Sequence, residues 1–184
     1  QFNYTPFMLQ DATHKMYKNY AKNFSGYIFC NIIRLFRNKL GITFSGAVHE
    51  SVDASCKEKG DVMKTDLWLH HYQFERGETF MKEKQLHYLQ IYKKNIDAYP
   101  DKARAYRDIA SIYYTYLNDY ATARTFFEKS LALQTKNRKT YVGLALCYLK
   151  ERDATSALHI LEEGLTLFPD DAQLLHLKNI VRGV

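Results

Sequence analysis

The feature of this sequence that most restricts its fold is a 34-residue unit, residues 138–171, whose layout recurs just upstream. Each copy predicts two amphipathic helices, because apolar residues recur at three- and four-residue spacing in both of its halves. Alanines stand where the two helices of a copy would cross: Ala110 with Ala123, and Ala145 with Ala157. Only a short side chain permits close approach there, so their recurrence indicates a true internal repeat.

The large apolar positions of the two copies also agree. The first helix carries Tyr141, Leu144 and Tyr148 in the later copy, and Tyr106, Ile109 and Tyr113 in the earlier one. The earlier copy has one extra residue in the turn between its helices, and it lacks the proline that closes the later copy at Pro169. Residues 94–100 look like the last turn of a preceding unit, and residues 172–181 like the first helix of a following one.

This pattern resembles the tetratricopeptide repeat, over roughly residue 84 to the C-terminus. The resemblance implies an α-α superhelix whose units bury their apolar faces only by stacking on neighbours. An unrelated helical bundle is the alternative. Between the packing tyrosines, we expect Arg107, Tyr114 and Arg138 to face a groove that holds a peptide, a protein or a second copy of the chain.

Upstream of about Gly77 the periodicity is mostly that of strands. Residues 8–23 read as a helix, residues 53–60 as a polar loop, and three segments as strands: 27–36, 42–52 and 62–72. Residues 84–99 then read as a long helix stopped by Pro100. We therefore expect a mainly α chain with a small N-terminal α/β portion, in which a few β-strands (residues 1–77) cap the repeat domain (residues 78–184).

Strand geometry would decide which side chains of this portion share a face. In an extended segment 42–52, the side chains of Phe44, Gly46, Val48 and Glu50 would lie on one face, with His49 on the other. The neighbouring His70 and His71 would point in opposite directions, so at most one of them can enter a common site.

A series of short motifs runs through residues 30–90, in this order: Arg34-Leu35-Phe36-Arg37-Asn38, Gly41-Ile42, Phe44-Ser45-Gly46, Val48-His49-Glu50, Asp66, Leu67, Leu69, His71-Tyr72, Lys82 and Lys84. In order and spacing the series resembles the C-terminal part of family 2 glycosyltransferases of the GT-A type, in particular bacterial or archaeal members with tetratricopeptide repeats downstream. That resemblance implies a sugar-nucleotide donor, a protein or glycan acceptor, and a divalent metal, manganese or magnesium.

The resemblance also implies roles for individual residues. A diphosphate leaving group needs positive charge around it, and an acceptor hydroxyl needs a carboxylate to take its proton. His49 and Glu50 would be the catalytic pair, with His49 close to the metal or diphosphate, and Arg34, Arg37 and His71 would contact the substrate or its phosphates. The structural alternatives are a hydrogen-bonded edge pair for His49 and Glu50, solvated arginines, and a core histidine at His71.

The sequence departs from that family in several places. It has no Asp-x-Asp metal motif, and Gln73 replaces the glycine that usually follows the histidine-tyrosine pair. The nucleotide-binding half would lie upstream. Because the chain begins at Gln1 without a methionine, we expect it to be a fragment of a longer enzyme and to be inactive and free of cofactor by itself.

Composition narrows the remaining choices. The net charge of +6 is spread evenly, with 10 basic and 7 acidic residues up to residue 76 and 16 against 13 after it, which disfavours a nucleic-acid-binding face. The three cysteines are far apart and form no C-x-x-C pair, which favours a reducing, cytoplasmic setting. A stand-alone repeat scaffold for protein binding or self-association is the main alternative to the enzyme, and an RNA-binding helical array is the third.

Overall fold

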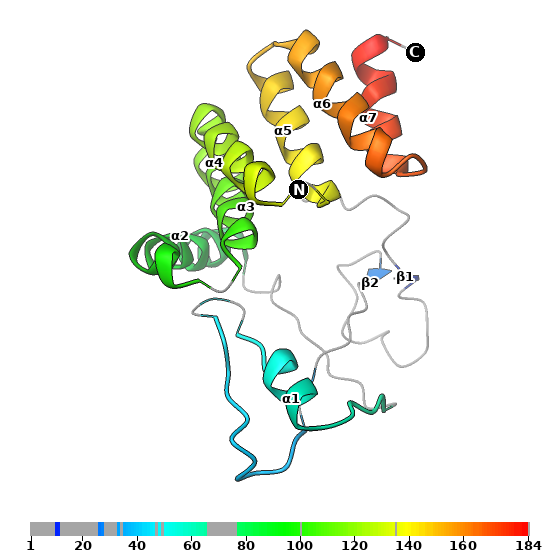
Figure 1. Ribbon diagram of the computed structural model, residues 1–184. Coiled ribbons are helices and arrows are strands. Elements are labelled where there is room, and N and C mark those ends of the chain that lie inside the picture. Colours follow the sequence, from blue (N-terminus) through cyan, green and yellow to red (C-terminus); the bar gives the residue numbers. More distant parts are fainter. Residues whose placement is uncertain are drawn as a thin grey trace. The chain divides into compact units, whose positions relative to one another are not determined.

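The computed structural model describes residues 10–11, 26–27, 33, 35–46, 48, 50–65, 77–99, 101–134 and 136–183. The chain divides into two compact units (Figure 1). The first comprises Gln1–Ile42 and Asp53–Val62, and the second comprises Thr43–Val52 and Met63–Val184. Each unit is described by itself.

The first unit contains little regular structure among its described residues. Two strands of two residues each, β1 (Gln10–Asp11) and β2 (Gly26–Tyr27), pair antiparallel. One helix, α1 (Asp53–Lys59), begins with an acidic residue and ends with Lys57 and Lys59 in its last turn, which complements the helix dipole at both ends. Its Cys56 side chain is buried.

These observations correct the predicted β cap in the described part of the chain. The predicted polar loop at 53–60 is helix α1, and the predicted helix at 8–23 has a strand at Gln10–Asp11. The predicted strand at 27–36 begins in β2 at Tyr27 but is not a strand at residues 33, 35 and 36. The predicted strands at 42–52 and 62–72 are not strands at residues 42–46, 48, 50–52 and 62–65, apart from the isolated bridge between Ser45 and Ser51. The other residues of these three segments lie outside the described part of the chain. β-branched and aromatic residues favour strand only where a neighbouring strand completes the hydrogen bonds.

Residues 42–52 form a closed loop instead of a strand. The N–H groups of Ser45 and Ser51 donate to each other's carbonyl oxygens, at 2.9 and 3.0 Å, in one isolated antiparallel bridge. Gly46 takes a φ of 90° just after the first of them. Glycine adopts this left-handed backbone without the steric cost that a side chain would impose, so the chain turns back there.

The second unit is a succession of helices. It comprises α2 (Gly77–Asn95), the 3-10 turn η4 (Ile96–Ala98), α3 (Lys102–Ile112), the π turn η5 (Tyr113–Leu117), α4 (Tyr120–Leu133), α5 (Arg138–Lys150), α6 (Ala154–Leu167) and α7 (Ala172–Arg182). The predicted long helix at 84–99 is present and starts earlier, at Gly77. None of the described helices is long and apolar enough to cross a membrane.

Asparagine or aspartate residues start each helix from α3 to α7. The side chains of Asp101, Asp119, Asn137, Asp153 and Asp171 each accept a hydrogen bond from a backbone N–H in the first turn of the following helix. Such caps satisfy N–H groups that have no partner within the helix. The start of each of these helices is therefore determined by a residue directly before it in the sequence.

The extra residue of the earlier repeat lies in its first helix. The inter-helix turns of both repeats have the same form, with a left-handed residue, Asn118 or Arg152, just before the capping aspartate. Ahead of this turn, residues Tyr113–Leu117 widen into a π turn, and the Asp119 N–H donates to the Tyr113 carbonyl oxygen at 3.1 Å. A π turn absorbs one additional residue without breaking the helix.

The predicted small residues do form the helix crossings. Ala110, Ala123, Ala145 and Ala157 are all fully buried. Helix α5 is buried on most of its circumference, from Thr140 to Ala145, because it packs against α3, α4, α6 and α7. A helix that is apolar all round belongs in the interior of an assembly, and here it is the centre of the stack.

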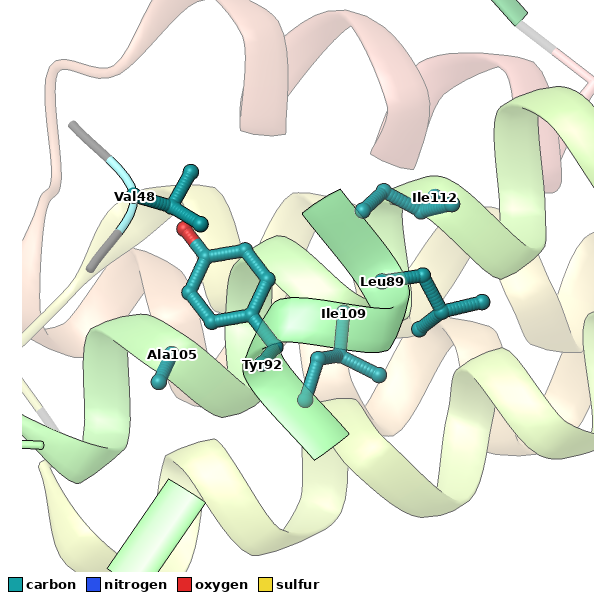
Figure 2. Close-up of a cluster of buried hydrophobic side chains, with 6 residues drawn as sticks. All are labelled: Val48, Leu89, Tyr92, Ala105, Ile109 and Ile112. Atoms are coloured by element: carbon teal, nitrogen blue, oxygen red, sulfur yellow. The ribbon is translucent and has the colours of Figure 1, made fainter. Parts of the chain in front are cut away.

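The first end of the stack has its own core. Leu89 and Tyr92 of α2 pack with Ala105, Ile109 and Ile112 of α3, and Val48 from the loop at 43–52 completes this cluster (Figure 2). The loop is thus part of the helical unit, although it is separated from α2 by more than twenty residues of sequence.

Candidate functional site

The residues that the sequence singles out for catalysis fall mostly outside the described chain. Arg34, His49 and His71 are among the residues that the structure leaves undescribed. Arg37 and Glu50 are described, and both are exposed. No described geometry brings these residues together, and their catalytic, phosphate-binding and metal roles stay predictions.

The expected shared face of Phe44, Val48 and Glu50 is not formed. Val48 is 5% exposed, whereas Phe44 is 61% exposed and Glu50 also lies on the surface. The reason is the Ser45–Ser51 bridge, which makes the segment a closed loop, so that alternate residues no longer line one side. Among the described residues, no three His, Cys, Asp or Glu side chains are grouped so that they could hold a metal ion.

The helical unit offers a different surface. Helices α3, α5 and α7 contact one another in succession, with α4 and α6 packed alternately between them, so these three form the inner row of the stack. Stacked helical repeats curve, and their concave, inner side is an extended surface suited to binding. The side chains of the inner row are therefore the candidate site.

Asp108 is at the centre of the first charged cluster on this row. Its carboxylate lies 3.7 Å from Arg104 Nε and 3.4 Å from Arg107 Nη2, and it accepts a 3.0 Å hydrogen bond from the Tyr92 hydroxyl. Burial, and then the Asp108 charge, raise the pKa of Tyr92 far above its ordinary value, so the phenol stays a hydrogen-bond donor. Two guanidinium groups face one carboxylate, which leaves a net positive charge centred on the 49% exposed Arg104 side chain.

Arg138 belongs to a second, neutral cluster. Its Nε lies 3.3 Å from Asp171 Oδ2, and its Nη1 donates to Gln173 Oε1 at 3.1 Å. The other carboxylate oxygen of Asp171 caps α7 by accepting from the N–H groups of Gln173 and Leu174. Arg138 thus ties α5 to the start of α7, and its charge is balanced within the stack rather than offered to a ligand.

The tyrosines at the repeated packing positions divide into two groups. Tyr141 is 1% exposed and belongs to the core, as the pattern predicts. Tyr106 and Tyr113 are half-buried and flank Phe126 of α4: the Tyr113 ring stacks on it at 5.7 Å, and the Tyr106 ring lies 6.0 Å from it.

Two lysines extend this aromatic group. Lys129 Nζ lies 5.1 Å from the centre of the Phe126 ring, a cation–π distance. Lys93 Nζ lies 2.6 Å from the Tyr113 hydroxyl oxygen and 5.1 Å from the ring centre, so it sits beyond the hydroxyl and donates to it rather than covering the ring face. Neither lysine pairs with a carboxylate among the described residues.

The equivalent tyrosine of the next repeat, Tyr148, also has a cation beside its ring, but this cation is neutralised. Arg124 lies 5.6 Å from the Tyr148 ring centre and forms ion pairs of 3.1 Å with Glu128 and 3.0 Å with Glu151. The Tyr148 hydroxyl also donates to Glu128, at 3.3 Å. Among the clusters described above, the positive charge that no carboxylate balances therefore lies at Arg104, Lys93 and Lys129.

The sequence analysis named Arg107 as groove-facing but missed the rest of the Asp108 cluster, and only part of this cluster carries a sequence signal. Arg104 and Asp108 stand four residues apart in a helix, a spacing that brings side chains together. Tyr92 lies 16 residues from Asp108 and on another helix, so its contribution depends on the packing of α2 against α3.

An alternating two-helix stack with capped turns and alanine crossings defines the class of α-α helical repeat proteins. Within it, residues 114–179 match the model of the tetratricopeptide repeat family. The match takes in α4, α5, α6 and nearly all of α7.

Solved structures show the same fold. The first tetratricopeptide domain of Spaghetti (RPAP3), bound to the HSP90 peptide SRMEEVD, is 21% identical with a TM-score of 0.51, over 56% of this chain and 82% of that one. The second such domain of human RPAP3, in complex with the HSP70 peptide SGPTIEEVD, is 20% identical with a TM-score of 0.50, over 59% of this chain and 90% of that one. No characterised protein matches this chain at a significant level of sequence similarity.

Proposed function

We propose that this chain is a protein-interaction module whose tetratricopeptide stack binds a peptide segment of a partner protein. The observation that carries the proposal is the stack itself, with a surplus of positive charge on its inner row at Arg104. The two structural neighbours are complexes with peptides that contain a Glu-Glu pair and end in Asp, which supports a peptide of acidic character. Such a ligand would be attracted by this charge.

A titration of the full chain tests this function. The probes are the peptide SRMEEVD and a version with glutamine at both glutamates, and binding is measured by calorimetry at low and high salt. We expect the acidic peptide to bind more tightly, and its affinity to fall with salt, because exposed charges are screened. The same peptide affinity at all salt concentrations, or no binding of either peptide at millimolar concentration, rejects the proposal.

Arg104→Ala and Arg182→Ala form a matched pair of variants. Both side chains are 49% exposed and carry the same charge, but Arg182 lies in α7 and pairs with Glu162, far along the stack from Asp108. Arg104→Ala is expected to weaken binding of the acidic peptide by roughly three- to tenfold, as the loss of a partly exposed charge does. Arg182→Ala should leave it unchanged.

The resemblance of residues 30–90 to glycosyltransferases supports a second proposal, that the chain is the C-terminal part of such an enzyme with His49 and Glu50 at its site. What supports it is the order and spacing of the sequence motifs. Its test is release of nucleoside diphosphate from a sugar nucleotide by the natural full-length protein with manganese or magnesium. Turnover should fall sharply in His49→Ala, and turnover that is absent, or unchanged in this variant, rejects the proposal.

A further inference from the structure

The net charge of this protein is concentrated in one stretch of its sequence, residues 12–49. Between Asp11 and Glu50 the sequence has no acidic residue. The stretch has six basic residues: Lys15, Lys18, Lys22, Arg34, Arg37 and Lys39. The rest of the chain holds the other 20 of the 26 Lys/Arg and all 20 Asp/Glu, so its formal charge is zero. The whole net charge of +6 therefore belongs to this stretch, which a division of the chain at residue 76 does not reveal.

One described part of this stretch, residues 35–41, is a turn at the surface of the first unit. All seven of these residues are exposed. Lys39 and Gly41 take left-handed φ angles of 66° and 68°, and the Lys39 N–H donates to the side-chain oxygen of Asn38 at 2.8 Å. The chain turns at residues 38–40, and residues 35–41 are here called the basic turn.

The basic turn presents apolar and cationic side chains together. Leu35 is 76% exposed and Leu40 is 47% exposed. Between them lie Arg37 and Lys39, and neither forms an ion pair with another described residue. A single exposed leucine is ordinary on a protein surface. Two leucines that flank two unbalanced cations are typical of segments at a membrane interface, where apolar side chains reach the acyl chains and basic ones reach the headgroups.

We propose that the basic turn is a docking site for an anionic lipid surface. Leu35 and Leu40 would enter the boundary between headgroups and acyl chains, while Arg37 and Lys39 would contact lipid phosphates. The positive charge of residues 12–49 would attract the same surface before contact is made. This site lies in the first unit and does not depend on peptide binding by the helical unit, so the two proposals fail separately.

The charge alone would also fit a nucleic acid, and the leucines decide between these two polyanions. Single-stranded nucleic-acid sites place aromatic rings or guanidinium groups against the bases. The most exposed apolar side chain of the basic turn is Leu35, an aliphatic group without a flat face on which a base can stack. A lipid surface instead has an apolar layer directly below its anionic one, which matches the leucines and the cations at once.

The experiment uses the full chain with vesicles of phosphatidylcholine, either pure or mixed with phosphatidylserine, and measures the bound fraction by sedimentation. We expect binding to the mixed vesicles and little to the pure ones. Affinity should fall roughly tenfold or more in high salt, because salt screens the attraction between exposed charges. Free phosphoserine at millimolar concentration should not displace the chain, since it carries the headgroup charge without the apolar layer.

Two apolar variants form a matched pair. Leu40 and Val62 both lie in the first unit, and they are 47% and 49% exposed. Leu40→Ser should weaken vesicle binding roughly five- to tenfold, because it removes an apolar side chain from the acyl boundary. Val62→Ser removes a similar exposed side chain outside the basic turn and should leave vesicle binding unchanged.

Two lysine variants form a second pair. Lys39→Gln and Lys57→Gln each remove one exposed positive charge, in the basic turn and in α1 respectively. Lys39→Gln should weaken binding roughly fivefold, the effect of one basic residue close to an anionic membrane. Lys57→Gln should have little effect, because this lysine stands next to the acidic Glu58. Arg37 is left unchanged, since the enzyme proposal gives it a substrate contact.

Several results would overturn the proposal. These are equal binding to pure and mixed vesicles, displacement by free phosphoserine, and equal effects of the two members of either pair. Binding of single-stranded RNA without binding of the mixed vesicles would assign the charge to a nucleic acid instead. Circular dichroism of each variant verifies that its fold is kept, which we expect because all four substituted side chains are exposed.

Discussion

Gly143 in α5 lies directly against the ring of Phe127 in α4. A Cβ atom at residue 143 would meet the Cζ, Cε1 and Cε2 atoms of that ring, the last at 2.7 Å, well inside van der Waals contact. Gly143 sits in the middle of a helix that is buried from residue 140 to residue 145. The absence of a side chain at this position therefore sets how closely the two repeats stack.

The first prediction is that Gly143→Ala destabilises the protein. Overpacking a filled core costs about 1–3 kcal/mol, which outweighs the gain of about 0.5–1 kcal/mol that alanine brings to a helix interior. Urea unfolding followed by circular dichroism measures the change in the free energy of unfolding. Gly143→Ala combined with Phe127→Leu should recover part of the loss, and a stabilised single variant would contradict the packing argument.

The second prediction concerns the buried hydroxyl of Ser130. Its Oγ donates to the Ala103 carbonyl oxygen at 2.7 Å and lies 3.4 Å from Thr140 Oγ1, which links α3, α4 and α5 through one buried group. Ser130→Ala leaves the carbonyl and the threonine hydroxyl short of a partner, which costs about 1–3 kcal/mol of unfolding free energy.

Thr140→Val is the matched variant. If the two hydroxyls act together, the effects of Ser130→Ala and Thr140→Val on the free energy of unfolding should be less than additive in the double variant. Strict additivity would show that the 3.4 Å pair contributes nothing beyond its members.

The third prediction is that Cys147 is chemically inert in the native state and makes the protein sensitive to alkali. Burial, and then the charge of Glu151, raise the pKa of the Cys147 thiol to about 12. Because the thiolate is the nucleophile, thiol reagents at pH 8 should label this residue only after unfolding. Rapid labelling of the folded chain at Cys147 would contradict the burial.

The sign of the pH effect follows from linkage. The unfolded thiol loses its proton near pH 8.5 while the native one keeps it until about pH 12, so the unfolded state binds fewer protons in this window and stability falls as pH rises. The slope for one such group is at most about 1.4 kcal/mol per pH unit. Urea unfolding at several pH values should show a shallower decline in Cys147→Ser, which cannot ionise.

The fourth prediction concerns the ion pair between Arg124 of α4 and Glu151 at the end of α5. The two groups are 3.0 Å apart and about a third or less exposed, and they join neighbouring repeats. A double-mutant cycle of Arg124→Gln and Glu151→Gln should give a coupling of about 0.2–1 kcal/mol that shrinks in high salt. A coupling that is insensitive to salt would mean that hydrogen-bond geometry, rather than charge, dominates the pair.

The repeat was readable from the sequence because its determinants are local. A capping residue, an apolar spacing and a small residue at each crossing lie within one 34-residue period, so Ala145 and Ala157 could be assigned to the core before any contact was known. The extra residue of the earlier copy was also visible. The sequence does not show that this residue lies in a π turn rather than in the loop, because both positions are consistent with the same spacing of apolar residues.

The first half was harder to read because strand formation depends on distant partners. The sequence pattern predicts that Val48 and Glu50 lie on the same face of a strand. In the structure the Ser45–Ser51 bridge closes a loop, so that Val48 is buried in the helical core and Glu50 is exposed to solvent. Arg138, which we predicted to face the groove, instead forms an ion pair with Asp171. This pair joins two helices, and sequence spacing alone does not predict it.

Sequence by itself determined that the second half of this protein is a stack of two-helix units, because helix caps, apolar spacing and small crossing residues act over one or two turns. Only the tertiary structure decided that Arg124 and Arg138 are balanced by carboxylates whereas Arg104, Lys93 and Lys129 are not fully balanced, and that Val48 completes the core of the first helices. The physical reason is that burial and charge neutralisation depend on which helices meet, and those contacts join residues that are far apart in the chain.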